Sequence, residues 1–203
     1  MIKNIIFDLG GVLLNIDFQR TYQAFEKLGA IEFPAIYSKN KQTSLFDDFE
    51  IGKISADIFR HVLKEELKLK ISNEEFDDAW NALLLDLPKS RLDFIEHIKK
   101  THRVFLFSNT NEIHLKAFFR ICQQEYGMNS LARYFDKEYY SCRFCKRKPD
   151  PDAFKIIVSE NNIKPSETLF IDDTLQHVQG AQQAELQAIH LTQDKTIFDV
   201  IER

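Results

Sequence analysis

Residues 5–14 read IIFDLGGVLL, so an apolar run ends abruptly in Asp8 and two glycines follow shortly after it. In an open α/β sheet, ligands bind in the crevice beyond the carboxyl ends of the strands. If residues 5–7 form a buried strand, Asp8 lies at that edge and becomes a candidate for the reaction centre. An Asp near Gly residues is also typical of an ordinary turn, and this stretch alone supports both interpretations equally.

Further apolar runs predict strands over residues 104–107, 168–171 and 188–191. Helix-like segments separate the later runs. This alternation is the spacing of β-α-β units, so the sequence favours a parallel sheet.

The long segment between the first two strand-like runs has apolar residues at helical spacing, which predicts an all-helical insertion. Ser72 and Glu75 have the spacing of a capping box. The apolar face that follows them predicts one helix continuing to Leu87 and ended by Pro88. Trp80 lies in this predicted helix and is expected to belong to a hydrophobic core.

These patterns together predict an α/β fold. A Rossmann-like parallel-sheet core is expected from residues 1–14 and 89–203, and a helical-bundle cap from residues 15–88.

The chain has 203 residues, of which 44% are hydrophobic and 29% charged, with a net charge of -4. This composition excludes a disordered chain, and the negative charge gives no general attraction for nucleic acid. No apolar stretch approaches the roughly 20 residues of a membrane span. We therefore expect a cytoplasmic enzyme without nucleic acid or membrane partners, and the sequence leaves its oligomeric state open.

Cys142 and Cys145 have the spacing of a redox or metal-binding pair. No second cysteine pair or histidine pair accompanies them to complete a zinc site. They are interpreted as incidental thiols, with a redox or metal role as the alternative.

Polar motifs recur after the later strand-like runs or before helices: Phe107-Ser108-Asn109-Thr110, Lys146-Arg147-Lys148-Pro149-Asp150 and Phe170-Ile171-Asp172-Asp173. With Asp8, and in this order along the whole chain, they resemble the haloacid dehalogenase superfamily. Its members carry an Asp nucleophile, then Ser or Thr, then Lys, then an acidic pair, with a cap inserted after the first strand. The stretch from Asp8 to Asp17 is similar to the branch that includes bacterial α-D-glucose-1-phosphate phosphatases.

The carboxylates predict a phosphoryl-transfer site. Asp8 is the candidate nucleophile, because a carboxylate can form an acyl phosphate that water then cleaves. A cation must separate a carboxylate from a phosphate, and oxygen ligands such as Asp8, the Gly10 carbonyl and Asp173 suit Mg²⁺. The resemblance implies that Asp173 is a direct ligand, whereas Asp172 holds a metal-bound water or the lysine.

The phosphate itself requires donors and positive charge. Ser108 and Asn109 are expected to hold phosphate oxygens near the start of the next helix. Lys148 supplies positive charge to the nucleophile and the transferring group, whereas Arg147 is interpreted as a residue that only solvates its loop. Gly11, like the glycine before it, is expected to present its backbone amide to the anion.

The chain departs from the family pattern at Gly10, where phosphatases of the superfamily usually have a second Asp that acts as acid and base. Its loss is expected to slow turnover. His177 is interpreted as a surface or helix-packing residue, with proton donation as the alternative. Asp17 is interpreted as a helix cap, with the role of a substitute acid as the alternative.

The sequence therefore predicts a Mg²⁺-dependent phosphatase that hydrolyses a small phosphorylated metabolite, such as a sugar phosphate, through an aspartyl-phosphate. The alternatives are a metal-free 2-haloacid dehalogenase and a module that binds a phosphorylated ligand or a partner protein without turnover. Arg20, Tyr37 and Lys41 are the cap residues named as candidates for substrate contact.

Overall fold

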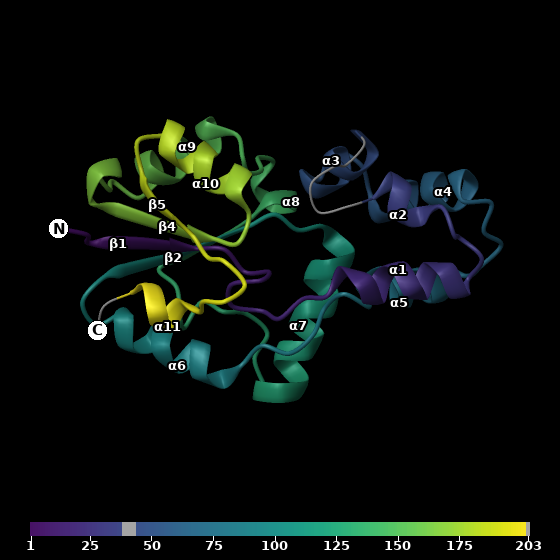
Figure 1. Ribbon diagram of the computed structural model, residues 1–203, viewed down its shortest axis with the longest axis horizontal. Helices are drawn as coiled ribbons and strands as arrows, with labels where there is room; N and C mark the ends of the chain where they lie inside the picture. Colours follow the sequence, from purple (N-terminus) through teal and green to yellow (C-terminus); the bar gives the residue numbers. More distant parts are fainter. Residues whose placement is uncertain (38–43, 202–203) are drawn as a thin grey trace.

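The computed structural model describes residues 1–37 and 44–201 (Figure 1). Within these residues, five strands form one parallel sheet in the spatial order β3-β2-β1-β4-β5. The strands are β1 (Asn4–Phe7), β2 (Arg103–Ser108), β3 (Lys137–Tyr140), β4 (Thr168–Asp172) and β5 (Gln187–His190). The predicted α/β class with a Rossmann-like parallel sheet is confirmed.

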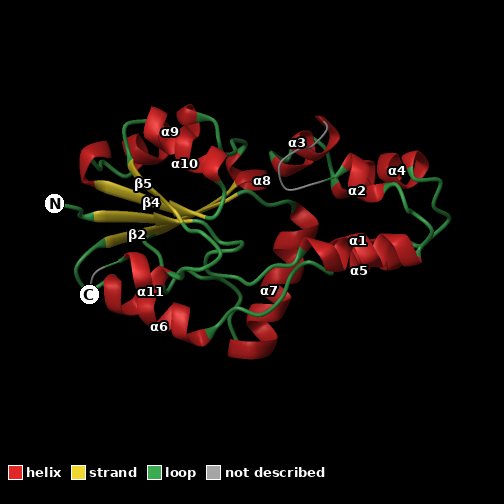
Figure 2. Cartoon of the chain, viewed as in Figure 1, coloured by secondary structure: helices red, strands yellow, loops and turns green. Residues whose placement is uncertain are grey.

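Helices cover both faces of the sheet (Figure 2). They are α6 (Lys89–Ile98), α7 (Glu112–Tyr126), α8 (Ser141–Phe144), α9 (Pro151–Glu160), the short 3₁₀ helix η1 (Pro165–Glu167), α10 (Leu175–Gln183) and α11 (Ile197–Val200). Successive side chains of a strand point to opposite faces. Ile5 and Phe7 pack with α6, α7 and α11, whereas Ile6 packs with α9 and α10. The central strand is therefore buried on both sides.

The sequence did not predict β3. The other four strands lie within one residue of their predicted bounds, but β3 reads KEYY and contains only two apolar side chains. It is an edge strand, paired only with β2 in the sheet order, and Lys137 at its start is exposed. An edge strand needs no continuous apolar run, because one side of it is not paired within the sheet.

The helices inserted between β1 and α6, here called the cap, lie beyond the carboxyl ends of the strands (Figure 1). Its helices are α1 (Phe18–Lys27), α2 (Phe33–Ile36), α3 (Ser44–Glu50), α4 (Ala56–Glu66) and α5 (Asn73–Asn81). Their apolar faces enclose a separate aromatic core that contains the buried Trp80, as expected. Phe25 stacks on Phe33, and Phe49 stacks on Phe59, each with 4.1 Å between ring centroids.

The helix predicted to continue to Leu87 ends earlier, at Asn81. The expected capping box at Ser72 is present. Beyond the helix, the chain turns back toward the core and pairs with the outgoing connection, where the Asp17 N–H donates to the Leu83 carbonyl oxygen at 2.9 Å. Pro88 is the N-terminal cap residue of α6 rather than the end of α5.

Two extended connections thus run side by side between core and cap. An antiparallel bridge joins Ile16 to Leu84, and backbone hydrogen bonds flank it on both sides. Leu83 and Leu87 are buried where these two connections pass each other. Their helical spacing therefore comes from burial at this crossing and not from a helix face. We propose the same division as the sequence, with residues 15–88 as the cap on a core of residues 1–14 and 89–203.

A buried polar joint fixes cap helix α5 to core helix α7. The Trp80 indole N–H donates to Asn111 Oδ1 at 3.3 Å, and the Trp80 carbonyl lies 3.0 Å from His114 Nε2. Asn111 Nδ2 lies 3.0 Å from His114 Nδ1. A carbonyl can only accept, so Nε2 carries the proton and Nδ1 accepts from the amide. The joint therefore requires neutral His114.

This joint predicts acid-sensitive stability. Burial lowers the pKa of His114 to about 4, below the roughly 6.5 of an unfolded histidine. Because the folded pKa is the lower one, the stabilisation is present above about pH 6.5 and is lost as the pH falls toward 4. Between pH 7 and pH 5 the free energy of unfolding should fall by about 2 kcal/mol from this group.

Urea unfolding at both pH values measures this loss. His114→Gln removes the titrating ring and retains an amide donor, so its stability should change less between pH 7 and pH 5 than that of the parent. Equal losses in the two proteins would rule out His114 as the source.

Candidate active site

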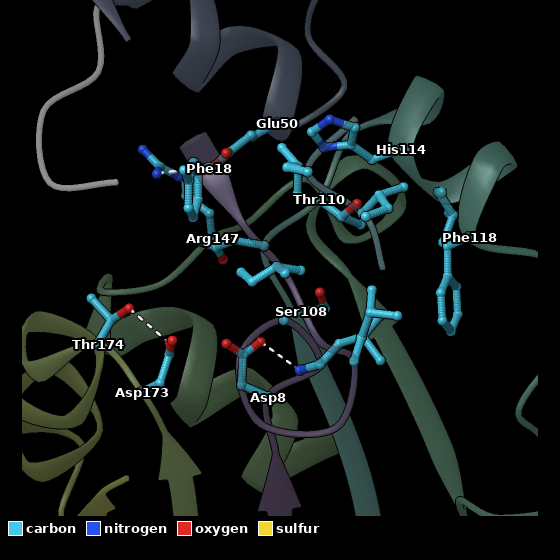
Figure 3. Close-up of a pocket in the computed structure, with 18 of the residues that line it drawn as sticks. Asp8, Phe18, Glu50, Ser108, Thr110, His114, Phe118, Arg147, Asp173 and Thr174 are labelled. Carbon is cyan, nitrogen blue, oxygen red and sulfur yellow. Dashed lines mark hydrogen bonds and ion pairs between the residues drawn. The ribbon is translucent and has the colours of Figure 1, made fainter. Parts of the chain in front are cut away.

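The carboxyl ends of β1, β2 and β4 meet at one pocket beneath the cap (Figure 3). Asp8 follows β1, Ser108 ends β2, and Asp173 follows β4. These strands are neighbours in the sheet, so their ends converge although they are distant in sequence. All three side chains line the pocket.

Lys148 lies fully buried behind this pocket. Its Nζ is 2.7 Å from Asp8 Oδ1 and 2.7 Å from Asp172 Oδ2. The ammonium also lies over the rings of Phe107 and Phe170, 5.5 and 5.4 Å from their centroids. Burial acts to lower the pKa of Lys148, but Asp172 and Asp8 outweigh it and raise the pKa. Lys148 is therefore a permanent cation between two carboxylates.

Asp8 is held through one oxygen. Its Oδ1 accepts from the Leu9 N–H at 2.7 Å as well as from Lys148. Burial raises the pKa of Asp8, the negative charges of Asp172 and Asp173 raise it further, and Lys148 acts in the opposite direction. Lys148 does not offset burial and the two neighbouring carboxylates, so the pKa of Asp8 stays above its usual value.

Asp172 points to the lysine. It is completely buried, and its oxygens accept from Lys148, from the Thr174 N–H at 2.7 Å and from His177 Nδ1 at 3.0 Å. Burial acts to raise the pKa of Asp172, but Lys148 and His177 hold it below the usual value. Of the two roles that the resemblance implied for Asp172, the geometry favours the one on Lys148.

His177 contributes to this arrangement, contrary to its interpretation as a surface or helix-packing residue. It lines the pocket on α10, and its ring nitrogen Nδ1 lies 3.0 Å from both oxygens of Asp172. Burial lowers the pKa of His177, which favours the neutral ring. The sequence feature that could have indicated this role for His177 is its position in the first turn of α10, shortly after the acidic pair.

Asp173 reaches the pocket because Gly11 has no side chain. Gly11 has a φ of +76°, and a Cβ built on it would lie 2.1 Å from Asp173 Oδ2. Its amide was expected to face an anion, but the Gly11 N–H donates to the Leu14 carbonyl oxygen at 2.9 Å. Gly11 therefore shapes the loop and admits Asp173, and its N–H is engaged within the loop.

Asn109 holds the backbone of Lys148, whereas its side-chain amide was expected to hold phosphate. Its Nδ2 donates to the Lys148 carbonyl and its Oδ1 accepts from the Lys148 N–H, both at 2.9 Å. Ser141 holds the backbone of Thr110 in a similar way. Its hydroxyl accepts from the Thr110 N–H and donates to the Thr110 carbonyl oxygen, both at 2.8 Å. The backbone of Lys148 is thus fixed by Asn109, and the backbone of Thr110 by Ser141.

Arg147 joins the core to the cap, contrary to its interpretation as a loop-solvating residue. Its guanidinium pairs with Asp47 and with Glu50, both on α3, at 3.0 Å in the case of Glu50. Arg147 and Glu50 line the active-site pocket. Their spacing of almost a hundred residues gave no local sequence signal for this contact.

The remaining candidates are divided between the pocket and other parts of the chain. Arg20 is exposed and pairs with Asp17, and Asp17 caps α1 by accepting from the Gln19 N–H at 2.9 Å. Tyr37 lines the pocket, and Lys41 lies outside the described residues.

Cys142 and Cys145 are free thiols, as are all the cysteines that the structure describes.

The pocket fits a hard divalent cation. Ligand atoms of Asp8, Asp172 and His177 lie within 4.8 Å of one another, and Asp173 and Gly10 line the same pocket. Carboxylate and carbonyl oxygens are the ligands that Mg²⁺ prefers. Asp172 is bonded to Lys148 and to His177, which leaves Asp8, Asp173 and Gly10 as the residues through which the pocket could hold such an ion.

Curated relatives include two phosphatases. The chain is 37% identical over 175 residues to a D-ribitol-5-phosphate phosphatase of Bacteroides thetaiotaomicron, covering 85% of this chain and 84% of that protein. It is 28% identical over 193 residues to a sesquiterpene phosphatase of Aspergillus oryzae, covering 94% of this chain and 90% of that protein.

A solved relative has the same architecture. The crystal structure of a HAD family enzyme from B. thetaiotaomicron, in complex with magnesium and inorganic phosphate, superimposes with a TM-score of 0.93 at 30% identity over 100% of both chains. The family model for haloacid dehalogenase-like hydrolases matches residues 2–185. The resemblance seen in the ordered motifs is thereby confirmed, and the chain belongs to the haloacid dehalogenase-like hydrolase family.

Proposed function

We propose that this hydrolase is a Mg²⁺-dependent phosphatase that releases phosphate from a small phosphorylated metabolite through an aspartyl-phosphate on Asp8. The observation that carries the proposal is the buried Lys148 ammonium, 2.7 Å from both Asp8 and Asp172, directly behind a pocket lined by Asp8, Asp173 and Ser108. The ribitol-phosphate phosphatase and the magnesium–phosphate complex among its relatives support it.

The first chemical step uses the free oxygen of the nucleophile. Oδ1 of Asp8 is fixed by Leu9 and Lys148, so Oδ2 attacks phosphorus, and the bond from phosphorus to the leaving oxygen breaks. Lys148 and the Ser108 hydroxyl stabilise the oxygens of the transferring group. Mg²⁺, when bound, supplies positive charge that lets the phosphate approach the carboxylates.

In the second step, water attacks the phosphorus of the acyl phosphate and the carboxylate of Asp8 leaves. The leaving oxygen of the first step must gain a proton and the attacking water must lose one. Gly10 cannot supply this proton transfer, which typically contributes about 10²- to 10⁴-fold to a rate. We therefore propose slow turnover of substrates with poor leaving groups.

The carboxylates favour phosphatase chemistry over the 2-haloacid dehalogenase alternative. One buried lysine contacts Asp8 and Asp172, and Asp173 acts on Asp8 as a further negative charge, so a carboxylate substrate would add another negative charge without a cation to offset it. A phosphatase uses the same carboxylates to bind its cation. The intact Lys148 arrangement likewise favours turnover over a module that only binds a ligand.

Magnesium removal provides the direct test. Phosphate release from a panel of sugar, polyol and alkyl phosphates should require Mg²⁺, disappear with EDTA and return when excess Mg²⁺ is added. Chloride release from 2-haloacids, measured without metal, should stay at background. Metal-independent chloride release, or no phosphate release from any panel member, would overturn the proposal.

Cytoplasmic location stays a prediction. No helix among the described residues is long and apolar enough to cross a membrane.

A further inference from the structure

The end of the pocket opposite Asp8 carries a shielded ion pair from two different parts of the chain. Glu50 is the last residue of cap helix α3, and Arg147 immediately precedes Lys148 in the core. Figure 3 shows Glu50 and Arg147 on the cap side, well separated from Asp8 and Asp173. A phosphate bound at Asp8 would direct the rest of its ester toward this pair.

The pair is largely removed from solvent. The side chains of Glu50 and Arg147 are 13% and 25% exposed, and their nearest charged atoms lie 3.0 Å apart. Tyr37 lines the same pocket beside them. Burial raises the pKa of the Tyr37 phenol, the charge of Glu50 raises it further, and Arg147 acts in the opposite direction. The cap end therefore presents charged donors and acceptors in a partly desolvated setting.

Such a pair discriminates between substrate tails. A hydroxyl group can donate to a carboxylate and accept from a guanidinium, so a hydroxylated chain replaces the water that it displaces. An alkyl chain would desolvate the charges and return no hydrogen bond, which is costly. Sites built to hydrogen-bond a hydroxyl reject analogues that lack it.

Apolar side chains form another wall of the pocket, including Leu14, Leu84 and Phe118. They can pack against the carbon backbone of a short substrate, but they offer no donor for its hydroxyls. Of the Asp, Glu and Arg side chains that line the pocket, Glu50 and Arg147 are the two on the cap side, away from Asp8 and Asp173. The curated relatives named above include a D-ribitol-5-phosphate phosphatase and a sesquiterpene phosphatase, so phosphatases similar to this chain differ in whether their names point to a hydroxylated or a hydrocarbon substrate.

We infer that Glu50 and Arg147 select phosphate monoesters of short, hydroxylated carbon chains and reject unsubstituted alkyl or prenyl phosphates. This inference rests on the proposed phosphatase function and names the substrate class of the same site. Arg147 also connects binding of the substrate tail to the position of Lys148. The two residues are adjacent in sequence, and Asn109 fixes the backbone of Lys148. A tail bound to Arg147 is thus placed at a set position relative to the Lys148 ammonium.

The test compares D-ribitol 5-phosphate with pentyl phosphate at saturating Mg²⁺. Both are phosphate esters of primary alcohols, so their leaving groups are similar and their tails differ in hydroxyls. The parent should prefer ribitol 5-phosphate by at least about 10²-fold in kcat/KM. Glu50→Gln should lower kcat/KM for ribitol 5-phosphate about tenfold or more, mainly through KM, and leave the value for pentyl phosphate within about threefold.

Asp47→Asn is the matched control. Asp47 also pairs with Arg147 from α3, but it does not line the pocket and its side chain is 45% exposed. If Glu50 acts on the substrate, Asp47→Asn should change both kcat/KM values equally and by less than about threefold. Equal losses for both substrates in Glu50→Gln, or no preference in the parent, would overturn the inference.

Binding separates this inference from the proposed chemistry. In an Asp8→Asn background with Mg²⁺, calorimetric titration should show at least about tenfold tighter binding of ribitol 5-phosphate than of pentyl phosphate, and Glu50→Gln should abolish the difference. If the parent releases no phosphate but this binding preference is found, the proposed phosphatase function fails and the selection by Glu50 holds. Equal binding of the two esters would overturn the selection, whatever the turnover.

Discussion

Asp8→Asn should reduce phosphate release by a factor on the order of 10⁴ or more, because loss of a nucleophile removes the covalent route itself. The amide retains the shape of the side chain, and its oxygen can still accept from the Leu9 N–H and from Lys148. It lacks the carboxylate needed to attack phosphorus. The measurement is kcat for phosphate release at saturating Mg²⁺ with whichever panel substrate the parent hydrolyses fastest.

Asp86→Asn is a suitable control for this variant. Asp86 is exposed, accepts from Asn15 Nδ2 at 3.0 Å and is not among the residues that line the pocket. It should keep kcat within about twofold of the parent, as expected for a surface substitution. An Asp8→Asn protein that retains a tenth or more of the parent's kcat, with equal purity and melting temperature, would show that Asp8 is not the nucleophile.

Gly11→Ala should weaken Mg²⁺ binding about 10- to 100-fold, the range typical of losing the support of a metal ligand. The new Cβ would lie 2.1 Å from Asp173 Oδ2, so the proposed ligand must move. Alanine is also disfavoured at a φ of +76° by about 1 to 2 kcal/mol. The measurement is the Mg²⁺ concentration that gives half-maximal phosphate release.

Gly10→Ala provides the neighbouring comparison. Its φ does not lie in the left-handed region, and a Cβ there meets only Ile16, with 3.3 Å to the nearest side-chain atom. The Mg²⁺ requirement of Gly10→Ala should therefore stay within about threefold of the parent. If the two alanine variants need the same Mg²⁺ concentration, the close approach of Gly11 to Asp173 does not control metal binding.

Local sequence patterns were sufficient to predict most of the core. Residues 5–7 and 104–107 are continuous apolar runs, and a strand buried on both faces has to be apolar throughout. The edge strand β3 carries charged residues at its start and so had no such signature. The predicted end of α5 was wrong because Leu83 and Leu87 are spaced as on a helix but are buried at the chain crossing.

Site residues with a motif could be predicted, whereas their partners could not. Asp8, Lys148 and Asp173 follow from the order of short motifs, and in the structure Asp8 and Asp173 line one pocket with Lys148 bonded to Asp8 behind it. The hydrogen bonds of Asn109 to Lys148 and the ion pair of Arg147 with Glu50 depend on tertiary contacts between distant segments. The type of a residue predicted whether its side chain could donate, accept or carry charge, but not which partner atom it would contact.

The antiparallel pairing of Ile16 with Leu84 places the two ends of the insertion next to each other. Directly opposite residues of such a pair have Cα atoms only about 4.5 to 5.5 Å apart, a gap that a short turn can close. The sheet thus does not depend on the insertion for its continuity. Replacing or deleting the cap would therefore leave the path of the chain through the sheet, and the strand ends that carry the site, unbroken.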